Sequence, residues 1–403
     1  MKQGWEIKKL GDVLTIERGG SPRPIDKYLT NSPDGFNWIK ISDATASDKY
    51  IFETKEKITK EGLHKTRMVN EGDFILSNSM SFGRPYIMKT SGCIHDGWLV
   101  LKENGQKIFD TEFLYYLLSS PYVFNQFDYL AAGSTVRNLN IALVSSVEVP
   151  IPPLPEQQRI VSILDEAFAA IAKAKANAEQ NLKNAKELFE SYLQGVFEKK
   201  GDGWESKKLG EVCETGAGGT PLKTHKDYYE GGTIPWLLSG EVSQGEIFEA
   251  KNFITDKGLK NSSAKMFPPN TVLVAMYGAT AGQVGILRFE ASTNQAVCGI
   301  LPNEKYLPEF IYYKFLAGKD ELVAQAVGGA QPNISQIKIK NTLVPLISIK
   351  QQQTIVRQLD ALRAETQKLE AVYQKKIADL EELKKSILQK AFAGELKTSQ
   401  EVV

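Results

Sequence analysis

The sequence has few of the features that mark secreted or membrane proteins. Its 403 residues include only three cysteines, Cys93, Cys213 and Cys298, and an odd number cannot form a fully paired disulfide framework. The chain has no apolar segment near its N-terminus like that of a secretory signal, and no run of about 18 apolar residues that could span a membrane. We therefore expect a globular protein of the cytoplasm, with enough residues for two or three domains.

Net charge is also nearly absent. The chain has 49 Lys and Arg residues against 48 Asp and Glu residues, which leaves a formal charge of +1. Proteins that bind nucleic acid often carry an excess of positive charge, so the total offers no argument for such binding. Only residues 350–397 lean positive. Any binding to nucleic acid must therefore come from local patches.

Catalytic and metal-binding motifs are missing as well. The chain has neither a G-x-x-x-x-G-K-[ST] phosphate loop nor the Asp/Asn-Pro-Pro-aromatic motif of amino methyltransferases. The lone glycine cluster at 214–219 is weak evidence for a cofactor site, and its counterpart at 17–20 lacks the cofactor-binding pattern, so the cluster predicts a turn. Cys93 and His95 form a Cys-x-His pair without tetrahedral zinc spacing, so we expect both to be structural. With only His64 and His225 besides, few general bases are present, and the sequence favours a chain without catalytic activity.

What the chain does contain is a long internal repeat. Segment 4–13, GWEIKKLGDV, returns at 203–212 as GWESKKLGEV. Later landmarks recur in the same order, namely GGSP at 19–22 and GGTP at 218–221, IT at 58–59 and 254–255, and EQQRIV at 156–161 and QQQTIV at 351–356. A duplicated chain presents two similar surfaces. It therefore suits a partner with its own two-fold symmetry, such as duplex DNA or a pair of identical subunits.

Each repeat begins with a region that predicts a mixed α/β domain. Short apolar runs such as 74–76, 98–101 and 147–149 are bounded by Gly, Asn, Ser and Pro, which favours strands and turns. Segments 113–118 and 310–315 are matching aromatic-rich stretches that predict core helices. We place these domains at residues 1–153 and 201–347.

A long helix follows each domain. Residues 151–155, IPPLP, interrupt the preceding structure, because proline removes a donor and disfavours the α conformation before it. Apolar residues then recur at steps of four and three, the pattern of a coiled-coil seam. The seam positions are Leu164, Phe168, Ile171, Lys175, Ala178, Leu182, Ala185, Phe189, Tyr192 and Val196 in one helix, and Ile355, Leu359, Leu362, Thr366, Leu369, Tyr373, Lys376, Leu380, Leu383 and Ile387 in the other.

We predict helices at 154–200 and 348–396, followed by a tail at 397–403. Each is about 60 Å long, too long for a surface helix of a compact domain, so we expect the two to pack on each other. A parallel pair would crowd both domains at one end, whereas an antiparallel pair places one domain at each end, and this favours an antiparallel coiled coil. Lys175 and Lys376 would then lie near its centre, where they either fix the register or extend out of the seam to solvent. The expected fold class is α+β, with two pseudo-two-fold-related mixed α/β domains separated by a long antiparallel two-helix coiled coil.

The helices keep their register between the repeats, whereas the domains diverge, as SMSFGR at 79–84 against YGATAG at 277–282 illustrates. In this organisation the chain resembles the specificity subunit of Type I restriction-modification systems. The segments that carry the resemblance are 19–22 (GGSP), 152–160 (PPLPEQQRI), 218–221 (GGTP), 234–240 (IPWLLSG), 331–335 (QPNIS) and 388–396 (LQKAFAGEL).

The resemblance implies that residues 1–153 and 201–347 are target-recognition domains, each reading one half of a bipartite, asymmetric sequence in double-stranded DNA. The coiled coil would set the length of the unread spacer and dock two modification (methyltransferase) subunits. Through these the chain would hold two restriction (ATP-dependent nuclease) subunits. S-adenosylmethionine, ATP and magnesium would belong to those partners, with no cofactor in this chain and no contact with a membrane.

Candidate DNA-binding residues are polar or basic side chains in loops, since Arg, Lys, Asn and Gln read base edges and hydroxyls bind phosphate. In the first domain they are Arg18, Ser21, Arg23, Lys27, Asn78, Ser79, Ser81 and Arg84. In the second they are Thr220, Lys223, His225, Lys226, Tyr277, Thr280 and Gln283. Arg23 ranks first because Pro22 and Pro24 flank it.

Two other functions compete with this interpretation. Near-zero charge also fits a coiled-coil adaptor whose two domains bind proteins or glycans instead of DNA. A stand-alone DNA methyltransferase or nuclease is a further alternative, but the missing cofactor motifs argue against it.

Overall fold

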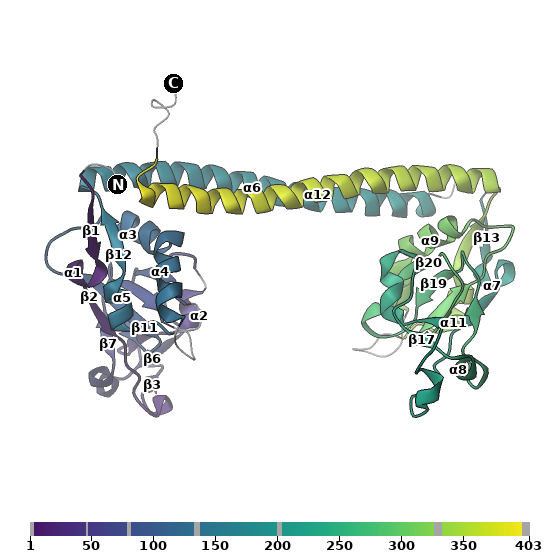
Figure 1. Cartoon of the computed structure of the whole chain (residues 1–403), viewed down its shortest axis with the longest axis horizontal. Coiled ribbons are helices and arrows are strands. Elements are labelled where there is room, and N and C mark those ends of the chain that lie inside the picture. Colours follow the sequence, from purple (N-terminus) through teal and green to yellow (C-terminus); the bar gives the residue numbers. More distant parts are fainter. Residues whose placement is uncertain are drawn as a thin grey trace, which may run out of the picture. The chain divides into compact units, whose positions relative to one another are not determined.

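The computed structural model describes residues 4–45, 47–78, 82–132, 138–199, 204–325 and 333–396. The chain forms two compact units, and neither is a simple half of the sequence. Unit 1 combines Met1–Ala178 with Lys375–Val403, and unit 2 is Glu179–Gln374. Each unit therefore contains one mixed α/β domain together with part of each long helix (Figure 1).

The described part of unit 1 holds two five-stranded sheets. The first has the order β2 (Leu14–Arg18), β11 (Trp98–Glu103), β8 (Phe74–Ser77), β9 (Pro85–Met88), β5 (Tyr50–Ile51). The second has the order β3 (Leu29–Thr30), β6 (Glu56–Ile58), β4 (Phe36–Ile39), β10 (Gly92–Ile94), β7 (Arg67–Val69). In Figure 1, β3 and β6 lie at the end of this unit that is remote from the two long helices.

Unit 2 repeats this topology with different strands. Its first sheet has the order β14 (Thr215–Ala217), β22 (Val297–Ile300), β19 (Val272–Ala275), β20 (Val284–Leu287), β16 (Glu246–Ile247). Its second has the order β17 (Phe253–Ile254), β15 (Ile234–Leu237), β21 (Ala291–Thr293), β18 (Met266–Phe267). Among the described residues, β3 is the strand without a counterpart in unit 2.

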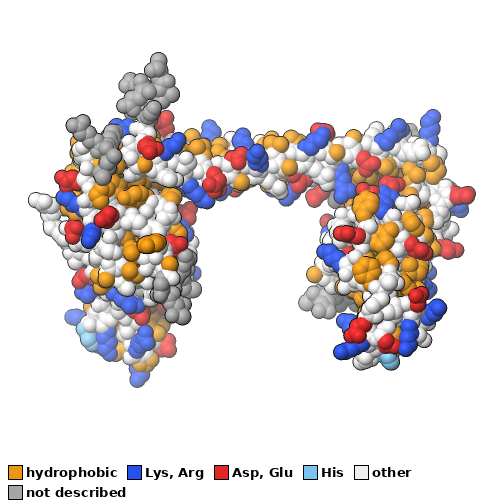
Figure 2. Space-filling view, viewed as in Figure 1, with side chains coloured by type: hydrophobic (Ala, Val, Ile, Leu, Met, Phe, Trp, Pro, Cys, Tyr) orange, Lys and Arg blue, Asp and Glu red, His pale blue; other side chains and the backbone are white. Residues whose placement is uncertain are grey.

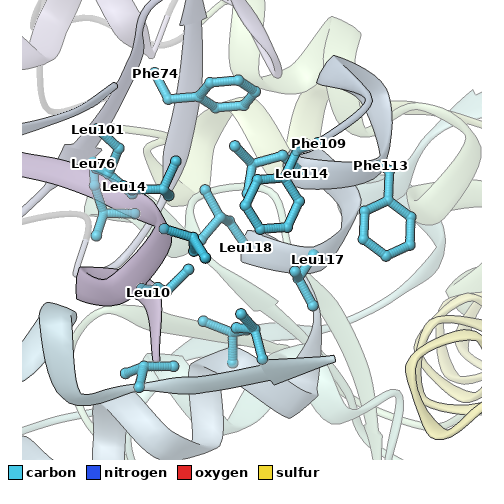
Figure 3. Packing of buried hydrophobic residues seen from close by; sticks show 14 of the residues in the cluster. Leu10, Leu14, Phe74, Leu76, Leu101, Phe109, Phe113, Leu114, Leu117 and Leu118 are labelled. Carbon is cyan, nitrogen blue, oxygen red and sulfur yellow. The ribbon is translucent and has the colours of Figure 1, made fainter. Parts of the chain in front are cut away.

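The central strands β8 and β11 are mostly apolar, and the buried part of each packs against a core on both faces. In β8, Phe74 and Leu76 point into the core on the helical side, whereas Ile75 points into the core between the sheets. This alternation is the two-residue period of a strand. Figure 3 shows the first of these cores, in which Phe74 and Leu76 face Leu114 and Leu118. The predicted strands at 74–76 and 98–101 are thereby confirmed.

Three helices cover the first sheet of each unit. In unit 1 they are α3 (Thr111–Leu118), α4 (Pro121–Ala131) and α5 (Ile141–Ser146), and in unit 2 they are α9 (Pro308–Ala317), α10 (Lys319–Ala324) and α11 (Gln336–Asn341). Asp110 caps α3 by accepting bonds from the backbone N–H groups of Glu112 and Phe113, at 3.0 and 3.1 Å. The aromatic stretches lie in α3 and α9, where Phe113 and Phe310 are fully buried, as the sequence predicts.

The repeated N-terminal motif forms a strand that pairs with the last strand before each long helix. In unit 1, β1 (Glu6–Lys9) runs antiparallel to β12 (Glu148–Ile151), and α1 (Leu10–Val13) follows β1. In unit 2, β13 (Glu205–Lys208) pairs with β23 (Leu343–Leu346) in the same way, and α7 (Leu209–Val212) follows. These ribbons join each domain to the start of its helix.

The remaining short elements are α2 (Ile41–Ala44), α8 (Asp256–Lys260) and the 3-10 turns η1 (Ile25–Lys27), η2 (Lys60–Lys65), η3 (Lys226–Tyr228), η4 (Ser239–Gln244) and η5 (Gly278–Thr280).

The long helices are α6 (Leu154–Glu198) and α12 (Ile349–Ala393), of 45 residues each. At 1.5 Å per residue each is about 67 Å long. In unit 1, Leu164 of α6 shares a core with Leu388 of α12, and further along α6 the Lys175 Nζ lies 2.5 Å from the Glu381 Oε1. Residue numbers therefore rise along one helix as they fall along the other. The helices run antiparallel, as predicted.

Burial along α6 follows the predicted seam only in part. Leu164, Ile171, Ala178 and Ala185 are buried. Tyr192, however, is 41% exposed, and Leu193 takes its place because it faces the core of the second domain. The drift has a physical cause, since an α-helix of 3.6 residues per turn rotates away from a strict seven-residue repeat.

The α12 seam departs further from the prediction. Leu359 and Thr366 are buried, but Leu369 and Leu383 are 42% and 47% exposed. Lys376 is exposed, as expected if it extends to solvent, whereas Lys175 forms its ion pair with Glu381. Full burial of a leucine contributes about 1.5–3 kcal/mol. The fully buried leucines of the helices, such as Leu164 and Leu359, belong to the domain cores. These positions therefore stabilise the helix pair more than the partly exposed seam positions do.

A buried glutamine at the start of each long helix joins it to its domain. The Gln157 Oε1 accepts a bond of 2.7 Å from the Asp110 N–H, and its Nε2 donates to the carbonyls of Ile108 and Pro152, both at 2.9 Å. Gln352 makes the equivalent set with the Leu307 N–H at 2.9 Å and with the Lys305 and Ile347 carbonyls at 2.8 and 3.0 Å. Both side chains are fully buried. This contact explains why the EQQ and QQQ segments recur.

A tyrosine and an aspartate form a second connection two turns further along each helix. The Tyr313 hydroxyl donates to the Asp360 Oδ1 at 2.6 Å, and the Tyr116 hydroxyl donates to the Asp165 Oδ1. Burial of the rings and the neighbouring carboxylates raise the pKa of both tyrosines. Both hydroxyls therefore remain protonated donors at neutral pH.

Replacing Gln157 by leucine should destabilise the junction between domain and helix. Leucine leaves the buried Asp110 N–H and two carbonyls without their partner, at a cost of about 3 kcal/mol. The matched control is Gln158→Leu, at an exposed neighbouring position, which should change stability by less than about 0.5 kcal/mol. Urea unfolding measures both variants, and hydrogen exchange at the Asp110 amide reports the lost bond directly. Equal stability of the two variants would contradict the role given to Gln157.

Candidate nucleic-acid interface

The GGSP and GGTP motifs lie against the turn that follows a strand of the second sheet in each unit. In unit 1 the N–H of Gly19 donates to the Trp98 carbonyl at 3.0 Å, and that of Gly20 donates to the Ile94 carbonyl at 3.1 Å. In unit 2 the N–H groups of Gly218 and Gly219 donate in the same way to Val297 and Thr293, at 3.1 and 2.9 Å. The backbone frame of the two turns is therefore the same.

Glycine is required at these positions by close approach. A Cβ on Gly19 would collide with the backbone of Ile94 and His95, and one on Gly218 would collide with the backbone of Thr293 and Asn294. The first glycine of each motif thus allows two backbone segments to lie in contact.

A hydroxyl from each motif then binds the side chain at the tip of the turn. The Ser21 Oγ donates to the Asp96 Oδ1 at 2.5 Å, and the Thr220 Oγ1 donates to the Gln295 Oε1. Asp96 and Gln295 occupy equivalent positions, because each lies two residues past the end of its strand, Ile94 in β10 and Thr293 in β21. One turn therefore presents a carboxylate and the other a carboxamide.

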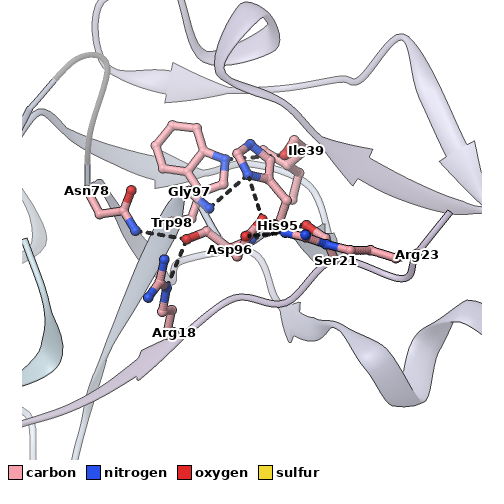
Figure 4. Close-up of polar contacts among 9 residues, drawn as sticks. All are labelled: Arg18, Ser21, Arg23, Ile39, Asn78, His95, Asp96, Gly97 and Trp98. Atoms are coloured by element: carbon pink, nitrogen blue, oxygen red, sulfur yellow. Dashed lines mark hydrogen bonds and ion pairs between the residues drawn. The ribbon is translucent and has the colours of Figure 1, made fainter. Parts of the chain in front are cut away.

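In unit 1 several predicted residues gather around Asp96 (Figure 4). The Arg23 Nη2 lies 3.3 Å from the Asp96 Oδ2, and the Arg18 Nε donates to the Asp96 carbonyl at 3.0 Å. The Asn78 Nδ2 donates to the same carbonyl at 2.8 Å. Arg23 is 80% exposed at its side chain, whereas Asn78 is only 1% exposed. Arg23 is thus available to a ligand, while Asn78 holds the turn in place.

A hydrogen bond and burial set the protonation of this turn. The Ser21 hydrogen bond is the main reason that the pKa of Asp96 lies below its ordinary value, so the carboxylate is ionised at neutral pH. Burial lowers the pKa of His95, which favours the neutral imidazole. In agreement, the His95 Nδ1 accepts a bond of 2.9 Å from the Gly97 N–H. The turn therefore carries one negative charge with two arginines beside it.

The equivalent positions in unit 2 carry no charge. Arg18, Arg23 and Asn78 correspond to Ala217, Leu222 and Met276, and Leu222 is exposed. Arginine can pair with guanine through two hydrogen bonds, and glutamine can do so with adenine. The two turns therefore have the same backbone but different capacities for recognition.

The other predicted residues lie elsewhere on the two units. Lys27 is exposed at the end of η1, and the Arg84 Nη2 lies 2.9 Å from the Asp48 Oδ1, beside a cavity of about 820 Å³ in unit 1. Lys223 is exposed, and His225 stacks on Tyr228 at 4.8 Å between ring centroids, next to exposed Lys226.

Tyr277, Thr280 and Gln283 lie around η5, where the Thr280 hydroxyl donates to the Tyr277 carbonyl at 3.2 Å. Ser79 and Ser81 lie outside the described residues. The structure therefore brings Arg18, Ser21, Arg23 and Asn78 together. The side chain of Arg84 pairs with Asp48 instead, and the η5 group belongs to a different loop from the GGTP motif.

Sequence reasoning missed Asp96, His95 as its neighbour, and Gln295. The available signal was their place in the repeat, because polar pairs, His-Asp and Asn-Gln, stand between matching strands in both halves. Charge gave no signal, and Figure 2 shows lysine and arginine side chains mixed with acidic ones over the face in view.

The described residues contain neither a cluster that could bind a metal nor a helix that could span a membrane. Within those residues, no group of three or more His, Cys, Asp or Glu side chains could hold a metal ion. All three cysteines are free and buried, Cys93 in β10. No helix in the described ranges has both the length and the apolar character to cross a membrane.

Comparison with known proteins gives a consistent result over the chain. The model of the family described as "Type I restriction modification DNA specificity domain" matches residues 2–183 and 201–379. A specificity subunit of the Type I restriction enzyme MjaIX from Methanocaldococcus jannaschii is 24% identical over 98% of this chain and 94% of its own length. The EcoR124I/EcoR124II specificity subunit of Escherichia coli is 30% identical over 53% of this chain, and the match spans about half of that relative, 54%.

A solved structure supports the fold. A chain from a type I restriction-modification system, in a study of complex assembly and conformational transition, superposes with a TM-score of 0.80. It is 21% identical, and the match covers 98% of this chain and 99% of that one.

Replacing Gly19 by alanine should disturb the turn around Asp96. The added Cβ collides with backbone, so we expect a loss of about 1–3 kcal/mol in the free energy of unfolding. The control is Gly195→Ala in α6, where no atom lies within 4 Å of the new methyl and alanine is the better helix former. Urea unfolding and hydrogen exchange at the Gly20 amide provide the measurement. A Gly19→Ala variant as stable as Gly195→Ala would show that close approach is not required.

Proposed function

The chain belongs to the Type I restriction-modification DNA specificity family, and from that membership we propose how its two units divide the reading of DNA. Each α/β domain reads one half of a bipartite, asymmetric sequence in double-stranded DNA. The observation that carries the proposal is the pair of turns with one backbone frame and different side chains at the tip, Asp96 and Gln295. A shared frame suits docking on the same kind of ligand, and different side chains suit unlike half-sites.

The target-recognition domains in this proposal are residues 1–153 and 201–347, with long helices at 154–200 and 348–396 and a tail at 397–403. Exposed Arg18, Arg23 and Lys27 in the first domain, and Lys223, His225 and Lys226 in the second, are suited to contact phosphates or base edges. Ser21, Thr220 and Asn78 orient the turns. Ser79, Ser81, Arg84, Tyr277, Thr280 and Gln283 remain proposed contacts outside the turns.

The helices act as the spacer and the docking surface. Both domain cores extend onto α6 and α12, so each domain is fixed to the parts of the two helices that lie in its own unit. Large apolar side chains on the helices are exposed and would suit contact with the two modification subunits. They are Leu188, Tyr192, Leu369, Val372 and Leu383.

Catalysis belongs to the partners in this proposal. The modification subunits would bind S-adenosylmethionine, and two restriction subunits joined through them would use ATP and magnesium, in the cytoplasm. Near-zero net charge supports this division, since phosphate contacts from the partners would add to the weak electrostatic attraction of this chain.

Exchanging one domain should change one half of the methylated sequence. In cells that express this chain with the modification subunit of its own system, we expect a bipartite motif with a fixed gap. Replacing residues 4–151 by the equivalent part of another family member should alter one half-site and retain the other. The matched control, an exchange of residues 204–346, should alter the opposite half. Sequencing of methylated bases is the measurement, and an unchanged motif in both exchanges would favour the adaptor function instead.

Lengthening both helices should lengthen the unread gap. Seven residues inserted after Ala178 in α6 and after Gln374 in α12 keep the seam and add about 10 Å, which equals about three base pairs. The half-sites should stay as they are, because neither domain changes. Seven substitutions at exposed helix positions, without insertion, serve as the control. An unchanged gap in the lengthened chain would refute the spacer role.

A further inference from the structure

The two turns allow a finer assignment, which rests on the proposed function. We propose that Arg23 in unit 1 and Gln295 in unit 2 are the specificity-determining side chains of the turns, with Asp96 and Thr220 as the residues that position them. Arg23 reads a guanine in one half-site, and Gln295 reads an adenine in the other. Each side chain is exposed at a turn whose backbone is held by the Gly-Gly contacts.

Asp96 orients Arg23 but leaves most of its hydrogen-bond donors available to a ligand. Its guanidinium uses one N–H toward the Asp96 Oδ2 at 3.3 Å, and a guanidinium has five such donors. Four donors are left for a forked contact with the O6 and N7 of guanine. Asp96 is itself fixed, since Ser21 binds its other carboxylate oxygen at 2.5 Å. The hydroxyl, the carboxylate and the guanidinium therefore form one chain of hydrogen bonds that ends at the exposed arginine.

Gln295 is oriented by Thr220 in a comparable way. The Thr220 hydroxyl donates to the Gln295 Oε1, which retains a second lone pair for the N6 amino group of adenine. The Gln295 Nε2 can then donate to the adenine N7. Leu222, at the place of Arg23, brings no competing charge to this turn. The turn in unit 2 thus offers a neutral acceptor and donor pair, which fits adenine and not guanine.

Unit 2 carries other residues at the positions of Arg23 and Asp96, and these residues define test variants for unit 1. Arg23→Leu and Asp96→Gln introduce the residues that unit 2 carries at the same positions, so both are compatible with the frame of the turn. Gln295→Glu keeps the size of the side chain and one acceptor oxygen but replaces the amide donor with a second acceptor oxygen. A carboxylate accepts from the N4 amino group of cytosine, so this variant should prefer cytosine where the parent prefers adenine.

The test uses the chain assembled with its modification subunits. One measurement is the methylated sequence motif, and the other is the affinity for duplexes in which each base pair is altered in turn, determined by competition. Arg23→Leu should lower discrimination at one guanine of one half-site by roughly ten- to a hundred-fold, without changing the other half-site. Asp96→Gln should weaken the same base preference, and the double variant should lose little more, because the two residues act together. Gln295→Glu should change one adenine of the other half-site to cytosine. Lys107→Leu and Gln244→Glu, at exposed positions away from the turns, should leave both half-sites intact.

The outcomes separate this inference from the proposed function. A bipartite motif that stays the same in Arg23→Leu and Gln295→Glu, or a uniform loss of affinity for all sequences, would overturn the assignment alone. Uniform loss would mean that these side chains contact phosphate. A parent chain with no bipartite motif would overturn the proposed function and the assignment with it. Thermal unfolding of each variant shows whether a lost preference comes from a lost fold.

Discussion

The core of each domain is completed by side chains from both long helices, and the rest of the structure depends on this contact. Leu164 and Leu388 belong to the core of unit 1, and Leu193 and Leu359 belong to that of unit 2. The middle of the seam holds small or half-exposed residues, which bury little apolar surface. The helix pair is therefore stabilised by the domain cores, and the same contacts orient the domains on the helices. A domain cannot rotate on its helix without exposing this core.

Gln157 and Gln352 add direction to that apolar contact. Apolar packing is non-directional, whereas three hydrogen bonds from one buried carboxamide define an orientation between the helix start and the preceding loop. The same bonds occur in both units, although the domains that they hold have diverged. The junction is thus the part of the duplication that must stay constant for two different domains to be presented in the same manner.

The GGSP and GGTP turns follow the same principle at a smaller scale. Backbone contacts through glycine are kept, and the side chains around the tip vary, from Asp96 with two arginines to Gln295 with apolar neighbours. Hydrogen-bonding groups that are held in place lose little entropy on binding, so a rigid turn can change its preference through one or two substitutions.

The sequence by itself determined the duplication, the two long helices and the mixed α/β class, because repeats and hydrophobic periods can be read from the order of the residues alone. It favoured antiparallel helices, and the contacts between α6 and α12 decided that pairing. It also indicated the family through short motifs. Only the tertiary structure decided that Leu193 replaces Tyr192 in the buried stripe, that Asn78 is buried, and that Asp96 joins Ser21 and Arg23. Those facts depend on contacts between distant parts of the chain, which follow from how strands and helices pack and leave no local period to detect.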